Sequence, residues 1–297
     1  MKQTPLTSRL RARLMRLMFD IVVPLMWLGR RPSVASVRRT AIAGPGGPLR
    51  LRIYTPPGTG PFPVMLYVHG GGWVIGSLAA YDGVARNLCR DNGCVVVAVD
   101  YRLAPEHRFP AASDDCLAAL AWVHANCAAL DGDTTRVVLA GDSAGGNLAT
   151  VTAARARDDA ALPVAGQLLI YPVTGYHTPP TPSYAEPDKG RMLSAAQMAW
   201  FFEQYLESPA AAGDPCACPL ARADLAGLPP ALVITAGHDP LRDEGRQYAQ
   251  ALAAAGVAVT ASHHAEQQHG FVGLSGPTRA HLRAMAEIRD WLARVLA

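Results

Sequence analysis

The stretch VVLAGDSAGGNLA, from Val137 to Ala149, places a serine between glycines where an apolar run gives way to helix-forming residues. Glycine destabilises both strands and helices, so its repetition here indicates a backbone conformation that other residues cannot adopt. Residues 141–145 match the pattern G-x-S-x-G, in which a serine hydroxyl is exposed on a sharp turn between a strand and a helix. We therefore expect Ser143 to be a nucleophile on a strained turn.

A second glycine run, HGGGW from His69 to Trp73, directly follows the apolar segment PVMLYV. Consecutive glycines free the backbone to direct several amide hydrogens toward one point, which is what a developing oxyanion requires. The alternatives are a flexible loop or a phosphate-binding turn, but no helix with a P-loop lysine follows. The run therefore favours an oxyanion hole.

A serine hydroxyl needs a neutral imidazole to take its proton, and a carboxylate to fix the tautomer of that imidazole. When a serine of this kind lies on a strand-to-helix turn, the acid and then the histidine follow later in the chain. Asp239 in GHDPLRDEG follows the apolar run 231–236, and His269 in QQHGF follows the run 257–262. We expect these two residues to be the partners of Ser143.

For the other acids and histidines near these motifs we expect structural or surface roles rather than catalytic ones. We expect three acids to be solvated or to cap helices: Asp142, Asp243 and Glu244. We expect His69 to brace its loop through hydrogen bonds, and three histidines to lie at the surface: His238, His263 and His264. In DYRLAPEHRFPA, from Asp100 to Ala111, an ion pair between Arg102 and Glu106 is expected, in a loop that supports the site.

Apolar runs of five or six residues alternate with alanine-rich helical stretches such as 111–129 and 242–254. Continuous apolar runs are typical of strands buried on both faces, so the pattern predicts a mostly parallel α/β sheet. The runs are 63–68, 94–99, 136–140, 166–171, 231–236 and 257–262. About sixty residues, rich in proline, separate two of these runs between Tyr171 and Ala231, which indicates an insertion such as a lid, with a helix over 194–207.

The first forty residues stand apart because arginines alternate with apolar residues at helical spacing from Arg9 to Ile21. Asp20 and Pro24 interrupt the apolar run, so we interpret it as mature protein rather than a signal peptide, in short helices punctuated by Pro5, Pro24 and Pro32. The run is too short to span a bilayer. Two roles remain: an anchor on a membrane surface, or a cover over the site, which we favour.

Composition limits the remaining classes of function. The chain has 297 residues, half of them hydrophobic, and a formal net charge of +3, so we expect one large domain and no nucleic-acid partner. Six cysteines without a framework pattern are best interpreted as free thiols, mostly buried, in a cytoplasmic protein. Cys216 and Cys218 lack a second Cys/His pair, so no metal site is expected.

The motifs HGGGW, DYRLAPEHRFPAA, GDSAGGNLA, DPLRDEG and HGF, taken together over about residues 37–297, resemble the hormone-sensitive-lipase-like microbial esterases of the α/β-hydrolase superfamily. The resemblance implies a mostly parallel eight-stranded sheet flanked by helices, with a helical cap. It makes residues 1–40 the N-terminal portion of the cap and 41–297 the catalytic domain, with a cap insertion at about 175–215.

The same resemblance implies Ser143, Asp239 and His269 as the catalytic triad, and it assigns the oxyanion hole to the amides of Gly71, Gly72 and Ala144. The expected activity is hydrolysis of short- to medium-chain carboxylic esters, for which Trp73 and an apolar cap would shape the pocket. No cofactor is implied. The alternatives are a pocket that binds without hydrolysis, and an amidase or deacetylase with the same triad. The sequence leaves a homodimer open.

Overall fold

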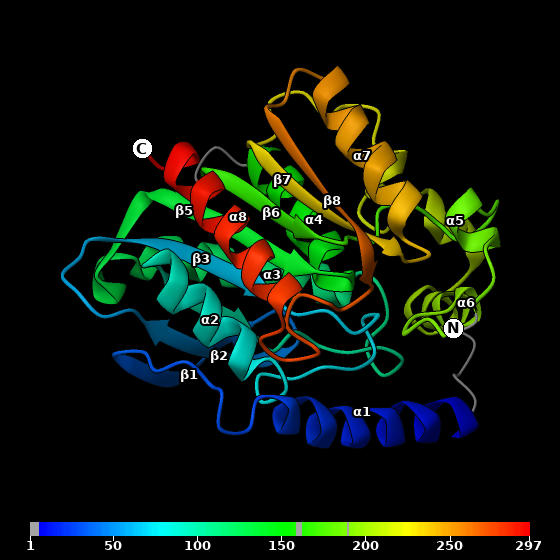
Figure 1. The fold of residues 1–297 in the computed structure, drawn as a ribbon, viewed down its shortest axis with the longest axis horizontal. Helices are drawn as coiled ribbons and strands as arrows, with labels where there is room; N and C mark the ends of the chain where they lie inside the picture. Colours follow the sequence, from blue (N-terminus) through cyan, green and yellow to red (C-terminus); the bar gives the residue numbers. More distant parts are fainter. Residues whose placement is uncertain (1–5, 159–161, 189) are drawn as a thin grey trace.

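The computed structural model describes residues 6–158, 162–188 and 190–297, and within these ranges eight strands form one twisted sheet at the centre of the molecule (Figure 1). The order across the sheet is β1-β2-β4-β3-β5-β6-β7-β8. β2 pairs antiparallel with β1 and with β4, and the other neighbours are parallel. The strands are β1 Ser36–Gly44, β2 Gly47–Thr55, β3 Phe62–Val68, β4 Val95–Val99, β5 Gly132–Asp142, β6 Gly166–Ile170, β7 Ala231–His238 and β8 Val259–Gln268.

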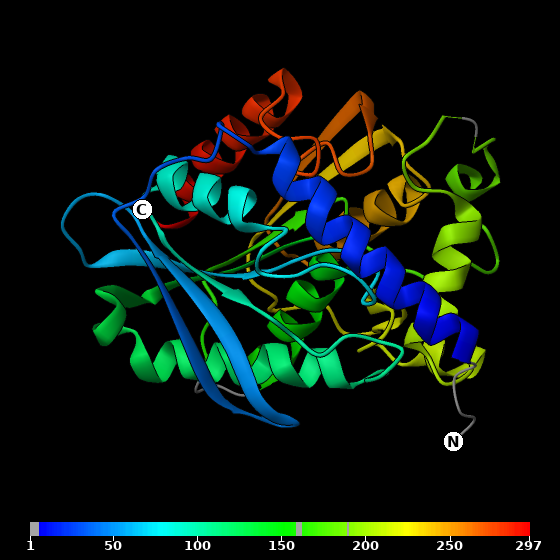
Figure 2. The ribbon, with the colours of Figure 1, turned by 90° about the horizontal axis from the view of Figure 1, so that it is seen from below.

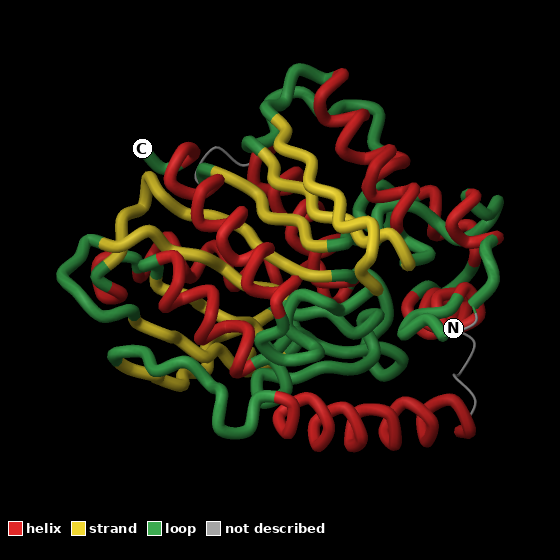
Figure 3. Tube along the Cα trace, viewed as in Figure 1, coloured by secondary structure: helices red, strands yellow, loops and turns green. Residues whose placement is uncertain are grey.

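Helices cover both faces of this sheet, as the continuous apolar runs predicted. Figures 1 and 3 show the helices packed around the sheet. Alternate residues of the central strands enter different hydrophobic clusters: Leu66 lies in a cluster with residues of α3, α4 and α7, and Tyr67 in one with residues of α2 and α8. The helices are α2 Asp82–Asn92, α3 Ala111–Asn126, α4 Ala144–Asp158, α7 Arg242–Ala254 and α8 Arg279–Val295.

Strand β8 departs from the predicted position and burial. We expected a strand over 257–262 that was buried on both faces, but β8 begins at Val259, continues to Gln268 and is largely exposed. The reason is its place at the edge of the sheet, where it has a neighbouring strand on one side only. Its greater length carries the chain to His269.

The long connection between β6 and β7 holds α5 Pro182–Ala185 and α6 Ala195–Tyr205, then the short 3₁₀ helices η2 Pro209–Gly213 and η3 Pro219–Ala221. Helix α6 begins at a capping box: the Ser194 hydroxyl accepts from the Gln197 amide, and the Gln197 side chain accepts from the Ser194 amide. This box sets the start of the helix predicted over 194–207.

Helix α1 is one continuous helix, Leu6–Met26, that lies across the loops at one edge of the molecule, with its first turns beside α6 (Figures 1 and 2). The prediction that Pro24 divides short helices was wrong: its missing N–H removes one hydrogen bond, to the Asp20 carbonyl, and the helix continues to Met26, while Pro5 lies outside the described residues. Ala12 and Val23 are buried on its inner side, and the Trp27 indole donates to the Gly273 carbonyl at 2.8 Å. No helix of the described ranges is long and apolar enough to cross a membrane.

Candidate active site

Ser143 lies on the turn between β5 and α4, with a φ angle of 57° that a residue with a side chain rarely adopts. The turn is held by backbone hydrogen bonds: the Ser143 amide donates to the Ile170 carbonyl at 2.8 Å, and its carbonyl accepts from the amides of Asn147 and Val173. Such a conformation costs on the order of 1–3 kcal/mol and persists because the surrounding contacts determine it.

The flanking glycines are required by close packing. A Cβ atom at Gly141 would lie 2.2 Å from the Gly145 carbonyl oxygen, and one at Gly145 would lie 2.0 Å from that of Val68. Both neighbours are backbone atoms, so no side-chain movement can make room. The glycines therefore allow strand and helix to approach closely at the turn that carries Ser143.

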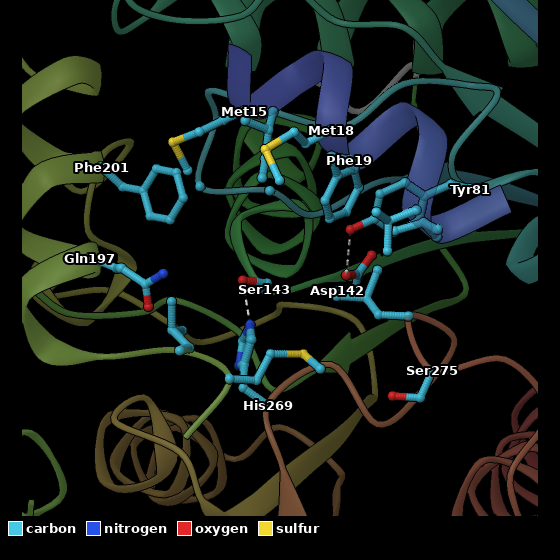
Figure 4. A pocket seen from close by; sticks show the side chains of 18 of the residues that line it. Met15, Met18, Phe19, Tyr81, Asp142, Ser143, Gln197, Phe201, His269 and Ser275 are labelled. Atoms are coloured by element: carbon cyan, nitrogen blue, oxygen red, sulfur yellow. Dashed lines mark hydrogen bonds between the residues drawn. The ribbon is translucent and has the colours of Figure 1, made fainter. Parts of the chain in front are cut away.

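The three residues predicted to form a triad are joined by hydrogen bonds, and Figure 4 shows the one between Ser143 and His269. The Ser143 Oγ lies 3.0 Å from His269 Nε2, and His269 Nδ1 lies 2.7 Å from Asp239 Oδ2. The second oxygen of Asp239 accepts from the Leu241 amide at 2.9 Å. The Tyr171 ring packs against the imidazole, with 4.6 Å between ring centroids. All three members are buried, so the imidazole is held in one orientation between hydroxyl and carboxylate.

The glycine run after β3 adopts a turn that leaves amides free. Gly71 and Gly72 have φ angles of 112° and 57°, which favour glycine, and the Gly71 carbonyl accepts from the amide of Ile75. Within the described ranges, the amides of Gly71 and Gly72 have no hydrogen-bond acceptor. Ala144 is the first residue of α4, where an amide has no partner inside the helix.

The prediction that Asp142 is solvated or capping was wrong. Its carboxylate is buried, and it accepts from the Tyr67 hydroxyl at 2.7 Å, the Gly70 amide at 3.0 Å and the Tyr81 hydroxyl at 3.2 Å. Burial raises the pKa of Asp142 to about 6, against these donors. The side chain therefore ties the glycine run to the turn that carries Ser143.

Glu244 is also buried, contrary to the same expectation. One of its oxygens accepts from the amides of Thr174 and Gly175, at 2.8 and 3.2 Å, where the chain enters the long connection. Burial raises the pKa of Glu244 to about 8. Asp243 is half-buried and pairs with Arg242.

Of the other histidines discussed from the sequence, three lie where they were predicted to lie and one does not. His69 Nδ1 contacts the Gly70 carbonyl at 2.8 Å and its ring stacks on Tyr101, so it braces the loop as predicted. His238 and His263 are exposed. His264 is buried against Phe271 and lies 3.2 Å from Glu287, so its assignment to the surface was wrong.

The predicted ion pair between Arg102 and Glu106 is absent, because each side chain has another partner among the described residues. Arg102 pairs with Asp115 of α3 at 2.9 Å, and Glu106 pairs with Arg16 of α1 at 2.7 Å. The loop nevertheless supports the site, since the Tyr101 hydroxyl donates to the His69 carbonyl at 2.9 Å.

An apolar cavity of about 470 Å³ opens beside Ser143 and His269. Helix α1 contributes six of its lining residues, and Figure 4 shows several of them facing the hydroxyl and the imidazole. These residues are Met15, Met18, Phe19, Val22, Val23 and Met26. Their i, i+3, i+4 spacing was visible in the sequence, but which surface they would cover was not.

Trp73 does not line this cavity, contrary to the prediction. It is fully buried and stacks on Tyr205, with ring centroids 4.1 Å apart, and it also contacts Phe202 of α6. Its role is to pack the glycine loop against the segment between β6 and β7. The cavity walls come instead from α1 and from residues such as Met198 and Phe201 of α6.

The cysteines are all free, and five of the six are buried, the exception being the half-buried Cys216. Burial raises the pKa of Cys218 to about 12, which opposes formation of the thiolate that a metal would require. Within the described ranges, no group of three histidine, cysteine or acidic side chains could hold a metal ion.

A serine on a strand-to-helix turn with a histidine and a buried aspartate, at the carboxyl ends of a mostly parallel sheet, defines a serine hydrolase of the α/β-hydrolase fold. Residues 65–273 match the family model described as alpha/beta hydrolase fold. The chain belongs to the hormone-sensitive-lipase-like carboxylesterases of this family, and it is a carboxylic ester hydrolase. The predictions of fold, family and activity are confirmed.

Particular relatives agree with this assignment. The carboxylic ester hydrolase LipN of Mycobacterium tuberculosis is 42% identical over 269 residues, which cover 86% of this chain and 70% of LipN. The ethyl acetate hydrolase of Pseudomonas putida is 43% identical over 219 residues, covering 72% of this chain and 68% of the relative. The crystal structure of EstE1, a thermostable carboxylesterase from a metagenomic library, superposes with a TM-score of 0.93 at 40% identity, covering 96% of this chain and 98% of EstE1.

Proposed function

We propose that this carboxylesterase works through an acyl-enzyme formed on Ser143, and the observation that carries the proposal is the hydrogen-bonded chain Ser143–His269–Asp239. His269 Nε2 takes the hydroxyl proton as Oγ attacks the ester carbonyl, and Asp239 stabilises the resulting imidazolium. His269 then protonates the leaving alcohol. Water, deprotonated by the same nitrogen, attacks the acyl group and restores the serine.

The oxyanion of both tetrahedral intermediates would be held by three backbone amides, those of Gly71, Gly72 and Ala144. Two features support this role. The amides of Gly71 and Gly72 have no acceptor among the described residues, and Asp142 fixes the loop that presents them. Removal of one such donor typically costs about a hundredfold to a thousandfold in kcat.

The substrates that suit the cavity are esters with short to medium acyl chains, since about 470 Å³ of mostly apolar space adjoins the serine. The relative from P. putida carries the name ethyl acetate hydrolase, which supports the short end of this range. Two segments would form the cap, since they supply much of the cavity wall: residues 1–40, which contain helix α1, and the connection over about 175–215.

The test is mass spectrometry of the protein quenched during turnover of nitrophenyl esters from acetate to palmitate, with a matched anilide. The expected result is an acyl adduct on the peptide that contains Ser143, with the highest kcat/KM between acetate and hexanoate. An adduct on another residue would contradict the nucleophile. Preference for the anilide would make the chain an amidase that retains esterase activity.

The cellular location and the oligomeric state of the protein stay predictions. A cytoplasmic location is proposed because the six cysteines are free thiols, and fractionation of the cells that make the protein tests it. A homodimer would be recognised by light scattering during size-exclusion chromatography. The proposed reaction at Ser143 depends on neither the cellular location nor the oligomeric state.

A further inference from the structure

The outer side of α1 carries a row of large apolar side chains that nothing in the described ranges covers. Each is more than half exposed, and their spacing of three or four residues places them along one stripe of the helix. This outer row consists of Leu6, Leu10, Leu14, Leu17, Ile21 and Leu25. Single exposed leucines are ordinary, but a continuous apolar stripe marks an interaction surface.

The charge around the outer row is positive. Arg9 and Arg13 are exposed on α1, and Arg30 and Arg31 are exposed just after it. Asp20 is the one acidic residue among the first forty of the sequence, and its carboxylate already accepts from the Ser77 hydroxyl at 2.7 Å. A second copy of α1 would bring like charges together, whereas an anionic surface complements them.

The outer row continues into the mouth of the cavity. Met18, Val22 and Met26, spaced four residues apart on α1, are between 45% and 66% exposed and also line the cavity beside Ser143. Met192, from the connection between β6 and β7, lines the same cavity and is about half exposed. Whatever surface receives the outer row therefore lies next to exposed residues of α1 that also line the cavity.

We propose that the outer row of α1 docks in the plane of an anionic lipid bilayer, with its side chains among the acyl chains and the neighbouring arginines at the headgroups. A helix with basic flanks and one long apolar stripe binds membranes in this orientation. Docking brings the cavity mouth to the lipid surface, so the esters that enter first are those dissolved in the bilayer. Only this last statement rests on the proposed function.

The test is sedimentation of the full chain with phosphatidylcholine vesicles that contain or lack phosphatidylserine. The wild type should bind the anionic vesicles, and added salt should weaken binding because it screens the arginines. The variant Leu14→Gln/Leu17→Gln/Ile21→Gln should reduce the bound-to-free ratio about tenfold or more, since it removes apolar surface from the docked face. None of these three side chains lines the cavity, so hydrolysis of a water-soluble acetate ester should be unchanged.

Two further variants serve as controls in the vesicle experiment. Leu282→Gln, at an equally exposed leucine of α8, should bind vesicles like the wild type. Ser143→Ala should also bind like the wild type, so that loss of hydrolysis and loss of docking are separate results. Wild-type protein that stays in the supernatant at low salt would overturn the proposal. So would a wild-type dimer that the triple variant converts to a monomer, because a second copy would then cover the outer row.

Discussion

The turn that carries Ser143 and the helix α1 face each other across one cavity, yet they are built in opposite ways. The turn is buried and is fixed by backbone contacts so close that glycine is required at Gly141 and Gly145. Helix α1 is attached by side chains such as Arg16, and by Trp27 just after it, and most of its residues are exposed. The chemistry therefore resides in a rigid element, and access to it in an element that can vary.

The largest effect on activity is expected at Ser143, on the rigid turn. Ser143→Ala should lower kcat by about a thousandfold or more, because no other group supplies the attacking oxygen. The thermal midpoint should stay the same, since one hydroxyl contributes little to packing. The matched control is Ser275→Ala, an exposed serine that lines the same cavity and should change kcat little. Turnover by Ser143→Ala near the wild-type rate would contradict the assignment.

The rigidity of the turn predicts a large loss of stability for Gly145→Ala. Its Cβ atom would lie 2.0 Å from the Val68 carbonyl oxygen, so the free energy of unfolding should fall by about 3 kcal/mol. Urea denaturation measures the change. Gly213→Ala is the control, because a Cβ there has no neighbour within 4 Å. Equal stability of the two variants would mean that the turn is more adaptable than its contacts indicate.

The raised pKa of Glu244 predicts how the stability of the fold depends on pH. Its pKa is raised to about 8 in the folded protein, above its ordinary 4.5, so folding retains a proton that the unfolded chain has lost. The free energy of unfolding therefore falls as pH rises between about 4.5 and 8, with a limiting slope of about 1.4 kcal/mol per pH unit.

Glu244→Gln should remove that slope, and the interval from pH 6 to 8 is the informative one because Asp142, with a pKa of about 6, titrates mostly below it. Urea denaturation at several pH values gives the measurement. Glu266→Gln, at an exposed glutamate, should keep the wild-type slope. An unchanged slope in Glu244→Gln would show that Glu244 is ionised in the folded state.

The smallest effect is expected at the attachment of α1. The Arg16 guanidinium donates to the carbonyls of Val74 and Ala104 and to Glu106, so Arg16→Gln should weaken the docking of the helix by about 1 kcal/mol. Hydrogen exchange within α1 should become faster, while exchange in α4 should not. Arg13→Gln is the control, because Arg13 is largely exposed and lies 4.0 Å from Glu106. Equal acceleration in α4 would mean that the two regions open together.

The sequence predicted those features that are marked by residues within a short stretch of the chain or by their order along it. Glycine spacing marks the turn at Ser143, and the order of acid and histidine after late strands identifies Asp239 and His269. What it missed depends on contacts between distant segments. Asp142 was expected to be solvated or capping, and its hydroxyl partners were missed because they lie more than sixty positions earlier in the chain. Arg102 was paired with Glu106 because both lie in one motif, whereas its partner in the structure, Asp115, lies on α3.

The carboxylate of Asp142 has a consequence for enzyme engineering. It joins the turn that carries Ser143 to the glycine run through the Gly70 amide, and it also accepts from the hydroxyls of Tyr67 and Tyr81. The side chains of Tyr67, Tyr81 and Asp142 come from three separate segments of the chain, so exchanging one of them alone leaves a buried carboxylate or a buried hydroxyl short of a partner. A loop grafted from another esterase to reshape the site would need to bring its own partners for this carboxylate.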